Sequence, residues 1–217
     1  MNEEQIGLIE LLIGVLRTPK STFNRIDEKK LISGLIIIII IGVLRAGSSA
    51  LYVNKIPIEV LIPEIEQSSV DISRVAQNIG TISAIGGFLS VIIWYIVVVL
   101  IIHGLNVLTG KPGAIKKTFA MNGFASIPFA LQQLLRLVDS IITSPETLTN
   151  YYISKTAITG NFLRSLTNTN TLTIFGVYVW ILMGFATSEN YVISKRRALS
   201  FSLVPYLLFF FYNYLFA

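Results

Sequence analysis

Residues 88–102 read FLSVIIWYIVVVLII, a stretch of aliphatic and aromatic side chains with a single serine and no charge. It lies at the centre of a longer apolar segment that extends from Ile82 to Leu108. A helix that rises about 1.5 Å per residue needs about 20 residues to cross a hydrocarbon core of about 30 Å. Because lipid offers no hydrogen-bond partners to an open backbone, an apolar segment of this length must be helical in a membrane. The segment therefore predicts a transmembrane helix.

The composition of the whole chain agrees with a membrane location. Of its 217 residues, 53% are hydrophobic and 13% are charged, whereas a soluble domain carries about 25% charged residues. Such a chain has too little polar surface to cover a globule in water, so its apolar surface must face lipid. We therefore expect an all-α integral membrane protein whose immediate partner is the lipid bilayer.

Four other apolar segments accompany this one. Together they predict a bundle of five transmembrane helices, at residues 31–53, 82–108, 118–138, 172–188 and 198–217. The first span contains an unbroken run of isoleucine. We expect spans two and three to tilt or kink, and Pro128 and Pro205 to kink the third and fifth spans, in which they lie.

Basic residues alternate between the connecting segments and so predict the topology. They are frequent before the first span, between spans two and three, and between spans four and five, and they are sparse in the other two connections. The positive-inside rule then places the N-terminus in the cytoplasm and the C-terminus outside. We predict a multi-pass protein of the cell membrane, with a cytosolic segment at residues 1–30 and a membrane domain at residues 31–217.

The cytosolic segment has a helical pattern of its own. Apolar residues recur at helical spacing at Ile6, Ile9, Leu12, Ile13 and Leu16. This pattern predicts either an amphipathic helix in the membrane interface or a helix that packs under the bundle. Thr18 and Pro19 then resemble a cap and first-turn pair, which would open a second short helix with Phe23 and Ile26 on one face.

Polar side chains inside predicted spans are the candidate functional residues. The candidates are Arg45 in the first span, His103 and Asn106 in the second, and Asn122, Gln132, Gln133 and Arg136 in the third. The four on the third span form roughly one stripe, which should face the bundle because polar groups in lipid are costly. The stripe could line a substrate or ion path, or it could join helices by hydrogen bonds.

Several classes of function are excluded or disfavoured. The chain has no cysteine and one histidine, which argues against disulfides and against a metal site. The sequence contains no nucleophile motif, zinc-protease motif or phosphate-binding loop, so we expect no enzymatic activity and no cofactor. Basic residues do not interleave with aromatics as in nucleic-acid binders, so no nucleic-acid partner is expected. Small residues at the start of the second span suit close helix packing within the bundle or in a homodimer.

Four short motifs give the chain a family resemblance. Arg17, Pro19 and Phe23 form the Arg-x-Pro-x-x-x-Phe pattern, and Gly110 follows the second span after His-Gly-Leu. Gly123 and Pro128 form a Gly-aromatic-x-x-x-Pro step in the third span, and a basic turn precedes the last span. Over nearly its whole length the sequence resembles prokaryotic members of the Yip/Yif (Ypt/Rab-interacting) membrane proteins.

The resemblance implies a five-span bundle with a cytosolic N-terminus. Eukaryotic members contact Rab-type GTPases in early secretory membranes, but their Asp-Leu-Tyr-Gly-Pro motif is not found here. Our first hypothesis is therefore a non-enzymatic scaffold that organises the membrane or binds a protein partner at the cytosolic face. The alternative is a small transporter or channel with its path along the third span, Arg45 and His103.

Overall fold

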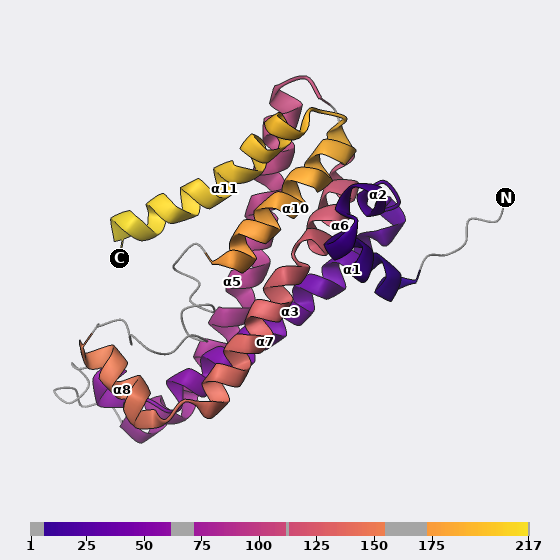
Figure 1. Cartoon of the computed structure of the whole chain (residues 1–217). Coiled ribbons are helices and arrows are strands. Elements are labelled where there is room, and N and C mark those ends of the chain that lie inside the picture. Colours follow the sequence, from indigo (N-terminus) through magenta and orange to yellow (C-terminus); the bar gives the residue numbers. More distant parts are fainter. Residues whose placement is uncertain (1–6, 62–71, 112, 155–172, 217) are drawn as a thin grey trace. The chain divides into compact units, whose positions relative to one another are not determined.

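The computed structural model describes residues 7–61, 72–111, 113–154 and 173–216 (Figure 1). All regular secondary structure in these ranges is helical, and they contain no strand. This confirms the all-α class that the apolar segments predict.

The helices follow one another with short connections. In chain order they are α1 (Leu8–Arg17), α2 (Pro19–Phe23), the 3-10 turn η1 (Glu28–Lys30), α3 (Leu31–Val53), α4 (Ile58–Leu61), α5 (Ile72–Leu108), α6 (Ile115–Ala125), α7 (Ile127–Ile142), α8 (Pro145–Ser154), α10 (Ile174–Tyr191) and α11 (Lys195–Phe216). Gly110 adopts a positive φ of 73° in the turn after α5, a conformation that side chains with a Cβ rarely accept.

Two stretches of the described chain are long and apolar enough to cross a membrane, Glu28–Val53 and Asn78–Leu108. The first contains α3, whose bounds coincide with the predicted first span. The second ends with α5, which begins before the predicted start at residue 82. The full count of five spans stays a prediction.

The third predicted span, 118–138, is divided between two helices. α6 ends at Ala125, and α7 begins at Ile127. Pro128 has no N–H and cannot donate to the carbonyl one turn earlier, which accounts for a break at this place. By contrast, α11 continues through Pro205. The fourth and fifth predicted spans lie in α10 and α11, except for Thr173, which is the N-cap of α10, and for residues 172 and 217, which lie outside the described residues.

The chain forms two compact units. Unit 1 comprises Met1–Ile40, Ile93–Ala130 and Thr169–Ala217, and unit 2 comprises Ile41–Ile92 and Leu131–Asn168. Three helices, α3, α5 and α7, contribute residues to both units.

Unit 1 has a core built from helices far apart in the sequence. α10 packs against α11, α6 and α2, and α1 packs against α2 and α6. The fully buried apolar side chains of this core include Leu11, Val15, Phe23, Ile26, Val98, Val99, Ile102, Met121, Phe124 and Leu182. Burying each large side chain contributes roughly 1.5–3 kcal/mol, so this interior fixes the short N-terminal helices against α6 and α10.

Unit 2 relies on small residues where α3 meets α5. A Cβ at Gly42 would lie 2.8 Å from the ring of Phe88, and one at Gly87 would lie 3.0 Å from the Ser49 hydroxyl. These contacts agree with the expected role of small residues in close packing. Gly86, in the same predicted pattern, has nothing within 4 Å of its would-be Cβ.

Candidate functional site

The N-terminal helices α1 and α2 form a hairpin with its corner at Thr18. The backbone N–H of Thr18 donates to the carbonyl of Gly14 over 2.7 Å, and its hydroxyl donates to the same carbonyl over 3.4 Å. Pro19 occupies the first turn of α2, as predicted, but the Thr18 side chain does not cap that helix. Thr18 therefore holds the N-cap position as predicted, but its hydroxyl points back to α1 and makes no capping hydrogen bond.

The hairpin is fixed to unit 1 by buried contacts. Phe23 and Ile26 are fully buried, in agreement with their predicted common face. The Tyr178 hydroxyl on α10 donates to the carbonyl of Leu16 over 2.6 Å. The hairpin therefore has a defined place in the unit.

The apolar residues of α1 divide between two environments. Leu11 and Val15, which the sequence pattern did not single out, are buried. Ile9 and Ile13 are 72% and 47% exposed, and Leu8 is 40% exposed. Leu12 and Leu16 are half-buried, and Ile6 lies outside the described residues. The helix therefore packs on the unit with one face and presents large apolar side chains to its surroundings with another.

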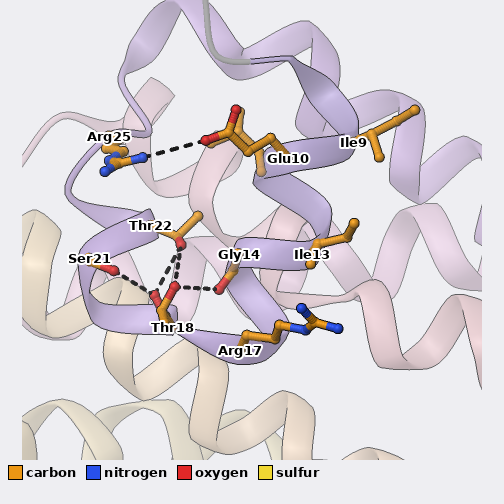
Figure 2. Close-up of a pocket in the computed structure, with 10 residues that line it drawn as sticks. Ile9, Glu10, Ile13, Gly14, Arg17, Thr18, Ser21, Thr22 and Arg25 are labelled. Atoms are coloured by element: carbon orange, nitrogen blue, oxygen red, sulfur yellow. Dashed lines mark hydrogen bonds and ion pairs between the residues drawn. The ribbon is translucent and has the colours of Figure 1, made fainter.

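A groove of about 620 Å³ runs along the hairpin (Figure 2). Its lining residues are Ile9, Glu10, Leu11, Ile13, Gly14, Arg17, Thr18, Ser21, Thr22 and Arg25. The groove lies within the size range of ligand pockets, which is about 300–1,000 Å³. It combines exposed aliphatic, cationic and hydroxyl groups in one place.

The charges of the groove do not balance. Arg25 and Glu10 form an ion pair of 3.7 Å at exposed positions. Arg17 is exposed and has no ion pair with any of the residues that the structure describes. The lining therefore has two cationic groups and one anionic group. An exposed pair such as Arg25–Glu10 contributes about 0–1 kcal/mol, so it opens at little cost.

A second polar group lies inside unit 1, where α5, α6 and α10 meet. Nδ1 of His103 and the Tyr191 hydroxyl are 2.6 Å apart, and that hydroxyl is 2.7 Å from Oγ1 of Thr118. Asn190 donates from Nδ2 to Oγ1 of Thr118 over 2.8 Å. Burial raises the pKa of Tyr191, while the hydrogen bonds with Thr118 and Asn190 lower it; the net shift is upward. The network joins three helices through side chains.

The predicted residues Asn106 and Asn122 are buried in the same unit. Each donates to a carbonyl one turn earlier in its own helix, Asn106 to Ile102 over 2.7 Å and Asn122 to Thr118 over 2.9 Å. Within the described part of the chain, the Oδ1 atoms of both have no hydrogen-bond partner. These oxygens remain available to a water molecule or a small ligand.

The other predicted residues, Arg45, Gln132, Gln133 and Arg136, fall in unit 2. The Arg136 guanidinium lies 5.4 Å from the ring centroid of Tyr52. Its positive charge repels the positive charge of Arg45. Tyr52 donates to the buried carboxylate of Asp139, which also accepts from Thr143 over 3.2 Å. Gln132 and Gln133 are buried. The structure therefore divides the predicted stripe of the third span between two units.

Sequence reasoning missed the groups that organise both polar clusters. Tyr191 and Thr118 lie near helix ends in unit 1, and Tyr52 and Asp139 lie near helix ends in unit 2. Of these residues, only Asp139 could have been noticed in the sequence, because a carboxylate next to a long apolar segment needs polar partners. Within the described ranges no three His, Cys, Asp or Glu side chains gather as metal ligands.

Two long apolar helices and the helical fold of the described residues indicate a membrane protein. The sequence matches the family model of the Yip1 domain over residues 13–216. The chain therefore belongs to the Yip1 domain family, as its motifs had indicated. Comparisons with curated proteins and with solved structures gave no match.

Proposed function

We propose that the protein is a non-enzymatic membrane scaffold, which organises the bilayer or a bound partner through its N-terminal hairpin. The observation that carries the proposal is the division of α1 between a buried face with Leu11 and Val15 and an exposed face with Ile9 and Ile13. A helix fixed on a folded unit with large apolar side chains exposed is typical of a contact surface. We further propose that this hairpin lies on the cytoplasmic side of the cell membrane, with the C-terminus outside.

The test uses the exposed side chains alone, because deletion of the helix would also remove its buried face. The full chain is purified in a mild detergent, and the proteins and lipids that accompany it are identified by mass spectrometry. The double variant Ile9→Ser with Ile13→Ser should lose its specific companions while keeping its thermal stability. Leu108→Ser is the matched control, since Leu108 is 85% exposed at the end of α5. Unchanged recovery in the double variant would contradict the proposal.

A small transporter is the second candidate, supported by one observation. Two buried amide oxygens of unit 1, on Asn106 and Asn122, have no hydrogen-bond partner among the residues that the structure describes. Such oxygens could contact a passing ion or a chain of water molecules. Proteoliposome flux that persists unchanged in His103→Ala and Arg136→Ala would rule out this path. A homodimer is a separate question, and native mass spectrometry of the same samples would count the copies of the chain.

A further inference from the structure

The exposed row on α1 ends in a cation. Ile9, Ile13 and Arg17 follow one another at four-residue spacing, so they share one face of the helix. Figure 2 shows all three on the same side of the hairpin, with Arg17 at its end. Aliphatic side chains beside a long cationic one match the boundary between acyl chains and headgroups, where arginine extends its guanidinium toward phosphate.

A second arginine, Arg25, lines the groove at its other end, beside Glu10 (Figure 2). Arg25 is 57% exposed, and its ion pair with Glu10 is long at 3.7 Å. A guanidinium binds a phosphate through two parallel hydrogen bonds, a stronger interaction than this exposed pair. The lining of the groove therefore carries two cations, Arg17 at one end and Arg25 at the other, and a single carboxylate. The lining is therefore complementary in charge to an anion.

We propose that the groove binds the phosphate of an anionic phospholipid, with Arg17 and Arg25 as its cationic contacts and Ile9 and Ile13 beside the acyl chains. This inference rests on the proposed function and names the partner of the hairpin. A lipid is favoured over an acidic protein segment because the aliphatic row and the cation form one continuous face of α1, as a bilayer interface requires. The hydroxyls of Thr18 and Ser21 line the same groove, and because each donates to a backbone carbonyl, their oxygens are left to accept from a hydroxyl of the headgroup.

The first experiment is a lipid titration of the full chain in detergent, followed by native mass spectrometry. The probes are phosphatidylglycerol and phosphatidylcholine with identical acyl chains. The wild-type chain should retain phosphatidylglycerol preferentially. A basic side chain near an anionic lipid surface contributes about a fivefold gain in affinity, so Arg17→Gln with Arg25→Gln should weaken this binding roughly 30-fold.

The matched control removes the same charge from the same segment. Lys20 and Lys29 are exposed and do not line the groove. Lys20→Gln with Lys29→Gln should change the affinity by at most about threefold, because only the general surface field falls. Equal weakening in the two double variants would show that charge alone attracts the lipid and would overturn the groove site.

Soluble sn-glycerol 3-phosphate distinguishes a lipid from a free phosphate. It should not displace phosphatidylglycerol, because it lacks the acyl chains that contact the isoleucines. Displacement at equal concentration would overturn the lipid and indicate a small phosphate compound instead. If the arginine variants lose a companion protein while phosphatidylglycerol shows no preference over phosphatidylcholine, the partner is an acidic protein. The proposed function would then stand and this inference would fall.

Hydrogen exchange on the wild-type chain gives a readout that needs no variant. Phosphatidylglycerol should slow amide exchange across residues 8–26 more than phosphatidylcholine does, since the bound headgroup would hold α1 and α2 together. Equal protection by the two lipids, or protection confined to other helices, would overturn the site even if the arginine variants failed to fold.

Discussion

Gly34 on α3 and Gly123 on α6 meet without side chains between them. A Cβ at Gly123 would lie 2.5 Å from the carbonyl oxygen of Gly34, and a Cβ at Gly34 would lie 2.7 Å from the carbonyl oxygen of Ala120. The two backbones are therefore in direct contact, an approach that only small residues permit. This contact gives a physical role to the glycine of the predicted family motif.

Substitution of either glycine by alanine should destabilise unit 1, because rigid backbone atoms occupy the place of the new methyl group. We expect Gly123→Ala to cost about 1–3 kcal/mol of unfolding free energy, measured by denaturation in detergent. Gly104→Ala is the control, since nothing lies within 4 Å of its would-be Cβ. That substitution should be neutral or stabilise slightly, by up to about 1 kcal/mol. Equal effects of the two would show that the contact is unimportant.

Removal of the Tyr191 hydroxyl should loosen the junction of α5, α6 and α10. Tyr191→Phe leaves Nδ1 of His103 and Oγ1 of Thr118 without that partner, and the expected loss is about 1–3 kcal/mol. Thermal denaturation of the purified chain measures it. Asn190→Ala, which removes one donor at the edge of the network, should cost less.

The pKa of Tyr191 also predicts a pH dependence. Burial raises this pKa, so the folded state favours the protonated phenol. Its contribution to stability is present below the unfolded pKa of about 10 and is lost as the pH rises through the folded pKa. The stability difference between wild type and Tyr191→Phe should therefore shrink above pH about 10. A difference that grows with pH would contradict the assignment.

Replacement of Val192 by glycine should stabilise the protein. It has a φ of 51° and a ψ of 50° at the end of α10, where a β-branched side chain is strained. Val192→Gly should raise the unfolding free energy by about 1 kcal/mol. Val107→Gly is the control and should have the opposite effect. Because Val107 lies within α5, a glycine at this position should lower the unfolding free energy by about 1 kcal/mol. A melting temperature that falls in Val192→Gly would indicate that the valine makes a necessary contact.

Lys55 should hold the end of α7 in unit 2. Its Nζ donates to the carbonyls of Ser140, Ile141 and Thr143 over 2.7, 2.8 and 2.9 Å. A cation at a helix C-terminus also interacts favourably with the helix dipole. Lys55→Met should cost about 2–4 kcal/mol by thermal denaturation, whereas Lys111→Met at an exposed position should be nearly silent. Similar melting curves for the two variants would refute the capping role.

The topology prediction is open to a direct labelling test, because the chain contains no cysteine of its own. Glu146→Cys should react with a membrane-impermeant maleimide in intact cells, and Lys116→Cys should react only after the cells are opened. Both positions are exposed. Labelling of Lys116→Cys in intact cells would reverse the predicted orientation.

The local part of this fold could be read from the sequence. The first predicted span coincides with α3, and the second shares its end with α5, because a long apolar run followed by polar turn residues fixes a helix end locally. The break near Pro128 follows from the missing N–H of proline. The family motifs were likewise visible, and the family match confirms the membership that they indicated.

What only the tertiary structure decided is which side chains meet. Periodicity placed Ile9, Ile13, Leu12 and Leu16 on one face of α1, yet Leu11 and Val15 are the buried residues, because the position of α2 and α6 selects the face that packs. The predicted polar stripe is divided between two units, because the boundary between them falls within α7, after Ala130. Contacts such as His103 with Tyr191 join residues far apart in the chain, and no local pattern in the sequence encodes such a pair.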